Sequence, residues 1–146
     1  MKISIKTFDE LSIQELYAIL QLRSEVFVVE QDCVYQDVDD KDQKAIHVIG
    51  YKNDAIVAYT RVFKPGDYFD DTSIGRVVVK ASERKYGYGR TIMQATIDYI
   101  DVVLKETQIA LSAQTYLIKF YNSLGFVEQG EGYLEDDIPH IKMVKS

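Results

Sequence analysis

The sequence lacks the features that mark membrane, disulfide-bonded or repetitive proteins. No apolar run approaches the roughly 18 residues that a membrane helix needs, and the start, MKISIKTFDE, has no signal-peptide core. The single cysteine, Cys33, cannot form an internal disulfide, which fits a reducing compartment. Only two prolines occur, and no repeat or glycine-rich linker divides the chain. We expect a cytoplasmic protein with no membrane partner, in which residues 1–146 form one domain.

Positive charge is also scarce. The chain has 17 lysines and arginines against 23 acidic residues, a formal net charge of -6. A broad surface for a phosphate backbone is therefore not expected, and nucleic acid is a poor candidate partner, although a local basic patch could hold a compact anion. No cysteine–histidine cluster has metal-ligand spacing, and the acids at 37, 39 and 42 lack the register of an EF-hand loop. We expect no metal site.

Hydrophobic periodicity predicts an α/β fold. Alternation predicts strands, and apolar spacing of three to four residues predicts helices. The predicted strands are a short one at Ile3–Ile5, then 46–51, 55–63, 73–79, 108–113, 126–129 and 139–144; the helices are 12–29, one from about 90 to 104, and 116–124. A three-residue connection, 52–54, suits a hairpin between the second and third strands. The order β-α-β-β-β-α-β-α-β-β predicts a mixed sheet with helices on both faces.

The segment that carries chemical information joins the fourth strand to the second long helix. Glycines at 87 and 89 let the backbone turn sharply, and the free N–H groups of the following helix, with Arg84, Lys85 and Arg90, complete an anion site. A dinucleotide loop would need a third glycine where Ile92 stands, and the Gly-Lys-Ser/Thr of a nucleotide hydrolase is absent. A turn that binds nothing remains an alternative.

Two motifs are similar to those of the GNAT superfamily of N-acetyltransferases. Arg84–Gly89 resembles its pyrophosphate loop, Arg/Gln-x-x-Gly-x-Gly/Ala, and the predicted element order matches its fold. Gln114–Phe126 resembles the second signature, with Tyr121 on the family tyrosine. Gln114 stands where the family commonly has asparagine, and Leu117 where it has alanine. The resemblance covers nearly the whole chain.

The terminal thirds resemble the bacterial ElaA-type subfamily. The similar residues are Arg23–Gln31, Cys33–Tyr35, Asp37, Asp39, Asp42, His47, Tyr133–Ile141 and Met143. Asp137 replaces a glycine in the usual Glu-Asp-Gly-Ile-Pro-His, and aspartate tolerates a left-handed turn better than most residues.

The resemblance implies an acetyltransferase that uses acetyl-CoA as its co-substrate. It places the thioester arm along the backbone of the fourth strand and implies that Tyr121 is the general acid. The implied coenzyme-binding residues are Val77, Val78, Val79, Arg84, Lys85, Tyr86, Gly87, Tyr88, Gly89, Arg90, Gln114 and Tyr121. For the valines the alternative is a buried strand, and for Tyr121 it is one more core aromatic.

The proton acceptor and the acceptor substrate are less constrained. Only two histidines occur, and an imidazole can accept a proton near neutrality. We favour His140 over His47, with Glu30 acting through water as the next choice, although lone histidines are often structural. The acid-rich segments Glu30–Asp42 and Glu135–Asp137 would favour a cationic amine if they border the acceptor cleft, and a solvated acidic surface is the alternative.

The sequence therefore predicts direct acetyl transfer to an amine within a ternary complex. The acceptor is a small molecule or a peptide. Two alternatives from other classes are a catalytically silent acyl-CoA-binding sensor and an interaction module whose glycines only make a turn. The sequence leaves open whether the protein forms a homodimer.

Overall fold

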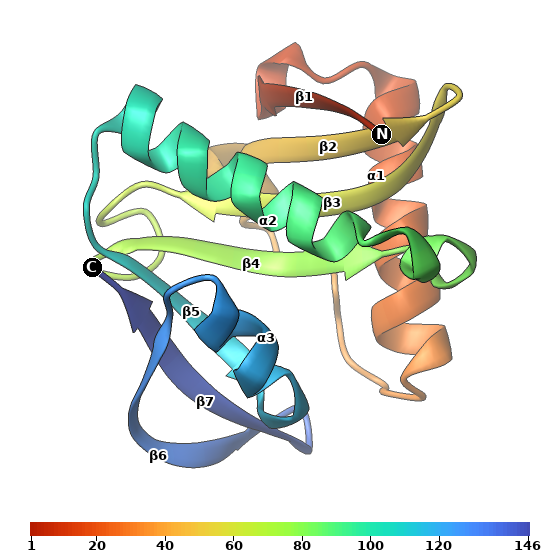
Figure 1. Cartoon of the computed structure of the whole chain (residues 1–146). Helices are drawn as coiled ribbons and strands as arrows, with labels where there is room; N and C mark the ends of the chain where they lie inside the picture. Colours follow the sequence, from red (N-terminus) through yellow and green to blue (C-terminus); the bar gives the residue numbers. More distant parts are fainter.

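The computed structural model describes residues 1–146 and contains one mixed seven-stranded sheet, shown in Figure 1. The strands are β1 (Lys2–Thr7), β2 (Ile46–Lys52), β3 (Ala55–Phe63), β4 (Thr72–Val79), β5 (Ile109–Gln114), β6 (Val127–Glu135) and β7 (Ile138–Lys145). Their order in the sheet is β1-β2-β3-β4-β5-β7-β6, and only the β4–β5 pair is parallel. The helices are α1 (Ile13–Arg23), α2 (Tyr88–Tyr99) and α3 (Ile118–Ser123). The predicted element order is confirmed.

Both long helices continue beyond their α-helical part. Ser12 caps α1 by accepting the N–H of Glu15, and the Glu15 carboxylate accepts the N–H of Ser12 in return, the capping box that the sequence predicts. A π-helical turn, Ser24–Glu30, extends α1, and another, Ile100–Leu104, extends α2. The predicted helical lengths are therefore correct, but part of each is wider than an α-helix.

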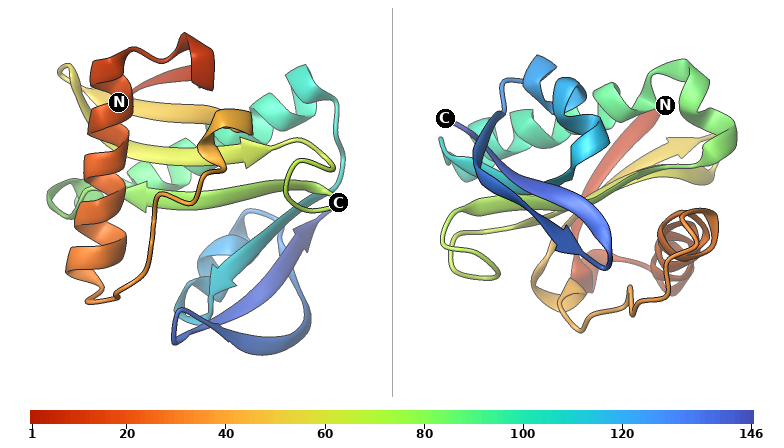
Figure 2. Two further views of the ribbon diagram at one scale, coloured as in Figure 1. Left: turned by 180° about the vertical axis from the view of Figure 1, so that it is seen from behind. Right: turned by 90° about the horizontal axis from the view of Figure 1, so that it is seen from below.

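The sheet is covered on both faces. Alternating strand residues point to opposite sides, so Val48 joins the cluster under α2 and α3, whereas its neighbour Ile49 joins the cluster under α1. The first cluster holds 16 buried residues and the second six. In Figure 2 the right-hand view shows α1 on one side of the sheet and α2 with α3 on the other. None of the helices combines the length and apolar character that crossing a bilayer requires.

Left-handed residues close the tight turns. The β2–β3 hairpin turns through two residues, Asn53 and Asp54, with φ of 50° and 68°, so the predicted three-residue connection is one residue too long. Asp136 and Asp137 turn the β6–β7 hairpin with φ of 51° and 63°. Asparagine and aspartate tolerate this region better than most residues, as we expected for Asp137. Gly125, with φ of 96°, follows α3 in the predicted C′ position.

The two parallel strands separate soon after they meet. Only Thr72↔Ile109 and Ser73↔Ala110 pair between β4 and β5, after which β5 pairs with β7 alone. Figure 1 shows the two strands diverging from their common end. β4 also carries a bulge, because Arg76 and Val77 together face one residue of β3, Thr60. The splayed strands leave one edge of β4 without a β partner.

Candidate active site in the gap between β4 and β5

A cavity of about 580 Å³ lies where β4 and β5 diverge. Its wall includes Ile74–Val79 of β4, Leu111, Ser112 and Gln114 of β5, and the side chains of Phe120 and Tyr121 from α3. Most of the residues that the sequence singled out line it: Glu30, Val77, Val78, Val79, Arg84, Gly87, Gly89, Arg90, Gln114, Tyr121 and His140. Lys85, Tyr86, Tyr88 and His47 do not. The fold thus brings together residues from both ends of the chain.

The N-terminal end of α2 forms one end of this cavity. Gly87 is the N-cap residue, with φ of 74°, and the first backbone bond of the helix runs from the Thr91 N–H to the Gly87 carbonyl at 3.2 Å. The preceding N–H groups therefore have no partner within the helix. A Cβ built on Gly87 meets nothing within 4 Å. An open space beside free N–H groups at a positive helix end fits a pyrophosphate.

The other loop side chains point elsewhere. Tyr86 and Tyr88 lie with their ring centroids 5.5 Å apart, and the Lys52 ammonium lies 4.0 Å from the centroid of Tyr86. The Lys85 ammonium lies 5.3 Å from that same centroid. Lys52 also donates to Glu83 at 2.8 Å. In this structure these side chains therefore form a cation–aromatic cluster and do not line the cavity.

Arg84 lines the cavity and pairs with Glu30, which also lines it. Its Nη1 and Nη2 lie 2.6 and 2.9 Å from the two Glu30 carboxylate oxygens, and its Nε donates to the Val79 carbonyl at 3.1 Å. Both side chains are more than a third exposed, so the pair contributes little to stability. The Glu30 carboxylate is therefore bound by Arg84, and Glu30 could act as a base only after this ion pair opens. The sequence suggested neither contact.

The backbone of β4 alternates between two neighbours. The Lys80 N–H donates to the Val57 carbonyl of β3 at 2.8 Å. Alternation in an antiparallel ladder then turns the Val78 main chain toward β3 and the Val79 main chain toward the gap. The Val78 side chain packs with Ile19 and Leu22 on the α1 face. Of the three valines, Val79 thus has the clearest free backbone edge.

Tyr121 is a buried phenol at the cavity wall. Tyr121 is 5% exposed, and its ring centroid lies 5.2 Å from that of Phe120 and 6.2 Å from that of Phe126. Burial raises the pKa of the Tyr121 phenol above its ordinary value, so the group carries its proton at neutral pH. Gln114, the other residue of the second signature, donates from Nε2 to Gln31 Oε1 at 3.3 Å.

The two histidines occupy different environments. His140 of β7 lines the cavity, with Nδ1 2.7 Å from the Ile138 carbonyl and Nε2 3.4 Å from the Glu135 carboxylate. Because a carbonyl only accepts, we assign the Nδ1 proton to that bond, which leaves Nε2 facing Glu135. His47 is fully buried between Tyr59 Oη, at 2.6 Å, and the Asp42 carbonyl, at 3.0 Å. Burial lowers the pKa of His47, which keeps it neutral and structural.

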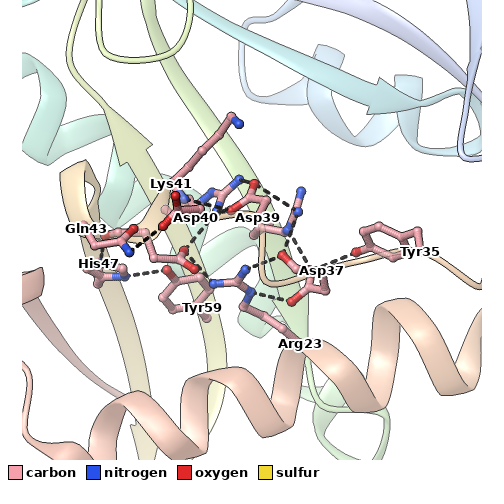
Figure 3. Close-up of polar contacts among 12 residues, drawn as sticks. Arg23, Tyr35, Asp37, Asp39, Asp40, Lys41, Gln43, His47 and Tyr59 are labelled. Carbon is pink, nitrogen blue, oxygen red and sulfur yellow. Dashed lines mark hydrogen bonds and ion pairs between the residues drawn. The ribbon is translucent and has the colours of Figure 1, made fainter.

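The acidic loop after α1 is built into a buried ion network (Figure 3). Arg23 is 0% exposed, and its Nε and Nη1 lie 2.9 Å from Asp37 Oδ2 and 2.7 Å from Asp42 Oδ1. Arg61 binds Asp42 at 2.9 Å and Asp39 at 2.6 Å. The hypothesis that these three aspartates draw cations to the cleft is not supported, because arginines neutralise them. In the sequence, the signal for this network is Arg23, a charged residue on the buried face of α1 that needs acidic partners.

Electrostatics keep the network ionised. Burial raises the pKa of Asp42, but the bonds and charges of Arg23 and Arg61 outweigh burial and hold the pKa below its ordinary value. Asp39 shows the same balance, with Arg61 and Arg76 lowering its pKa to about 2. No group of three or more histidine, cysteine, aspartate or glutamate side chains is arranged to hold a metal ion.

Comparisons with known proteins agree with this geometry. The family model for the GNAT acetyltransferase domain matches residues 8–146. The ElaA protein of Escherichia coli is 44% identical over 139 residues, which are 94% of this chain and 91% of that protein. A UPF0039 protein of Schizosaccharomyces pombe is 41% identical over 140 residues, which cover 94% and 92% of the two chains.

Solved structures give the same result. An acyl-CoA N-acyltransferase of Pseudomonas aeruginosa superposes over 100% of both chains with a TM-score of 0.94 and 39% identity. E. coli ElaA superposes over 99% of both chains with a TM-score of 0.92 and 40% identity. An aminoglycoside 6'-N-acetyltransferase complexed with coenzyme A shares the fold, with a TM-score of 0.74 and 18% identity over 99% of this chain and 96% of that one. The chain therefore belongs to the GNAT acetyltransferase family, in its ElaA-type subfamily, and is an acyltransferase.

Proposed function

We propose that the protein transfers an acetyl group from acetyl-CoA to a primary amine, directly and within a ternary complex. The observation that carries the proposal is a single cavity that joins the free N–H groups of α2, the open edge of β4 and the side chains of Tyr121 and His140. The structural neighbour complexed with coenzyme A supports the choice of co-substrate. We also propose that residues 1–146 act as one catalytic domain.

The coenzyme would lie between α2 and β4. The N–H groups at residues 88–90 and the open space at Gly87 would hold the pyrophosphate, while Arg90 adds charge. Val79 would offer its main chain to the pantetheine arm. Because Arg84 occupies the Val79 carbonyl in this structure, that side chain has to move away from Glu30 and Val79 when the coenzyme enters. Its guanidinium is then available to the phosphates.

Tyr121 would protonate the departing sulfur. A thiolate is a poor leaving group in a buried site unless a proton reaches it as the bond to carbon breaks. The phenol is buried at the cavity wall and is protonated at neutral pH, so it has a proton to donate.

His140 would accept the proton of the amine. With Nδ1 donating to the Ile138 carbonyl, the Nε2 lone pair faces the Glu135 carboxylate across 3.4 Å. A primary ammonium has three N–H donors, so it can donate to both groups at once and lose a proton to Nε2. The preference for a cationic amine therefore rests on Glu135 and Asp136, which line the cavity, and not on the acidic loop after α1. Glu30 is the alternative base if its pair with Arg84 opens.

The test is acetyl-CoA turnover with a panel of cationic, neutral and anionic primary amines. Release of free coenzyme A that depends on the amine, fastest with cationic amines, is the expected result. Cys33 is a partly exposed thiol, so thiol reagents need an enzyme blank or mass spectrometry must replace them. Tight acetyl-CoA binding without turnover would favour a silent sensor, and failure to bind would favour an interaction module. Both outcomes would refute the proposed transfer.

A further inference from the structure

The bulge in β4 contains a residue in a costly conformation. Arg76 has φ of 51°, a left-handed value for a residue with a Cβ, in the middle of a strand. Such a conformation costs on the order of 1–3 kcal/mol and persists only where its surroundings enforce it. The bulge, Arg76 and Val77, immediately precedes Val78 and Val79, and the Val79 main chain faces the proposed thioester arm. Whatever holds Arg76 therefore sets the position of that edge.

The surroundings that hold Arg76 come from the loop after α1. Its Nε lies 2.8 Å from Asp37 Oδ1, and its Nη2 donates to the Asp37 carbonyl at 3.0 Å. The guanidinium also lies 5.7 Å from the ring centroid of Tyr35, whose hydroxyl donates to the same Asp37 oxygen at 2.8 Å. Asp39 adds a longer contact to Arg76 at 3.3 Å.

Asp37 is itself fixed from the far side. Arg23 donates from Nε to Asp37 Oδ2 at 2.9 Å and from Nη2 to the Asp37 carbonyl at 2.9 Å. The Asp37 side chain is 5% exposed and does not line the cavity, so it has no direct access to a substrate. It connects α1, through Arg23, to the bulge, through Arg76.

We propose that Asp37 is a positioning residue, which acts through Arg76 to hold the β4 bulge and so places the Val79 main chain at the thioester. This inference rests on the proposed acetyl transfer for its kinetic part and on the geometry alone for its structural part. The Arg76 backbone would relax to a negative φ if its side chain were free. The buried Asp37 carboxylate, which contacts the side chains of Arg23, Arg76 and Tyr35, can prevent that relaxation. Displacing an aligned group by about 1 Å can cost about a hundredfold in rate.

The decisive comparison is Arg76→Ala against Arg76→Gly. Both variants remove the guanidinium, but glycine adopts positive φ without penalty and alanine does not. We expect Arg76→Ala to shift the backbone amide resonances of Val78 and Val79 and to lower kcat by up to about a hundredfold, with KM for acetyl-CoA little changed. Arg76→Gly should keep those resonances near their wild-type positions and retain much more of kcat. Asp37→Asn should lower kcat in the wild-type background but add little in Arg76→Gly.

Two results would overturn the inference. If the alanine and glycine variants lose kcat equally, the Arg76 side chain acts on a substrate rather than on the backbone. If both keep wild-type amide resonances, the bulge needs no anchor. The resonances are measured without substrate. They therefore decide whether Asp37 and Arg76 hold the bulge even if no amine is acetylated, a result that would refute only the proposed function.

Discussion

Replacing Asp42 by asparagine should reveal how strongly the buried ion network supports the fold. The Asp42 carboxylate accepts Arg23 Nη1 at 2.7 Å and Arg61 Nη1 at 2.9 Å, and the residue is 5% exposed. The asparagine side chain would be neutral, and its Oδ1 could still accept both bonds, because both arginines donate to Asp42 Oδ1. Arg23, which is fully buried, would lose half of its ionic partners.

The expected cost follows from that geometry. Breaking one side of a buried ion pair typically costs about 3–5 kcal/mol, because the remaining charge stays in a low-dielectric site. We expect about 3 kcal/mol here, at the lower end, since the amide oxygen can keep both hydrogen bonds and only the negative charge is lost. For a chain of this size that corresponds to a fall in Tm of about 6–12 °C. A domain with about 5–15 kcal/mol of stability would remain folded at room temperature.

Urea denaturation at neutral pH measures this free energy of unfolding, with an unchanged m-value as the check that the folded and unfolded states are comparable. The matched control is Asp40→Asn. Asp40 is exposed, accepts only from Gln43 Nε2 at 2.9 Å, and has a left-handed φ of 62° that asparagine also tolerates. Its expected cost is within about 0.5 kcal/mol. Equal losses in the two variants would refute the account of the network.

Comparing wild type with Asp42→Asn at different pH values gives a further prediction. Because the pKa of Asp42 is held below its ordinary value in the folded state, its contribution is complete above the unfolded value of about 3.9 and is lost as pH falls through the folded value. The difference in stability between wild type and Asp42→Asn should therefore be constant from neutral pH to about pH 5 and should shrink below about pH 4. A difference that grows on acidification would contradict the ionised state.

The remaining predictions concern the cavity. Gly87→Val should abolish acetyl-CoA binding, because valine disfavours φ of 74° and fills the cradle; the thermal stabilisation by ligand, about 2.7 kcal/mol at a hundredfold excess over Kd, should disappear. Tyr121→Phe should preserve affinity for acetyl-CoA and slow turnover about a hundredfold to ten-thousandfold. An unchanged kcat would mean that Tyr121 has only a packing role. His140→Gln should lower kcat far more than it changes KM for acetyl-CoA, because the proton acceptor is lost; a His47→Gln variant that loses kcat while His140→Gln keeps it would exchange their roles.

Much of the fold follows from local patterns. The alternation in β2 and β3, the capping box at Ser12 and the helix end at Gly125 each depend on neighbouring residues. Their physical causes are visible in a short window of sequence. The same holds for the loop at Gly87, where strand, glycines and helix follow one another. The left-handed turn at Asp136 and Asp137 also follows from neighbouring residues alone.

The parts that sequence reasoning missed depend on contacts between distant segments. Arg23 pairs with residues 14 and 19 positions away, and Arg84 meets Glu30 across 54 positions. Charge patterns alone do not say which acid meets which arginine, so a paired aspartate and a solvated one look alike in the sequence. The separation of β4 from β5 is also non-local, because these two strands, which α2 separates in the sequence, pair at only two positions.

The most direct test of the central claim is to follow an isotopically labelled acetyl group from acetyl-CoA. Mass spectrometry of the reaction with a cationic primary amine should find the label on the amine nitrogen, in an amount equal to the free coenzyme A released. Tyr121→Phe should slow the appearance of both products together. Label recovered only as acetate, or still on coenzyme A after the wild-type protein has bound it, would contradict transfer to an amine in this cavity.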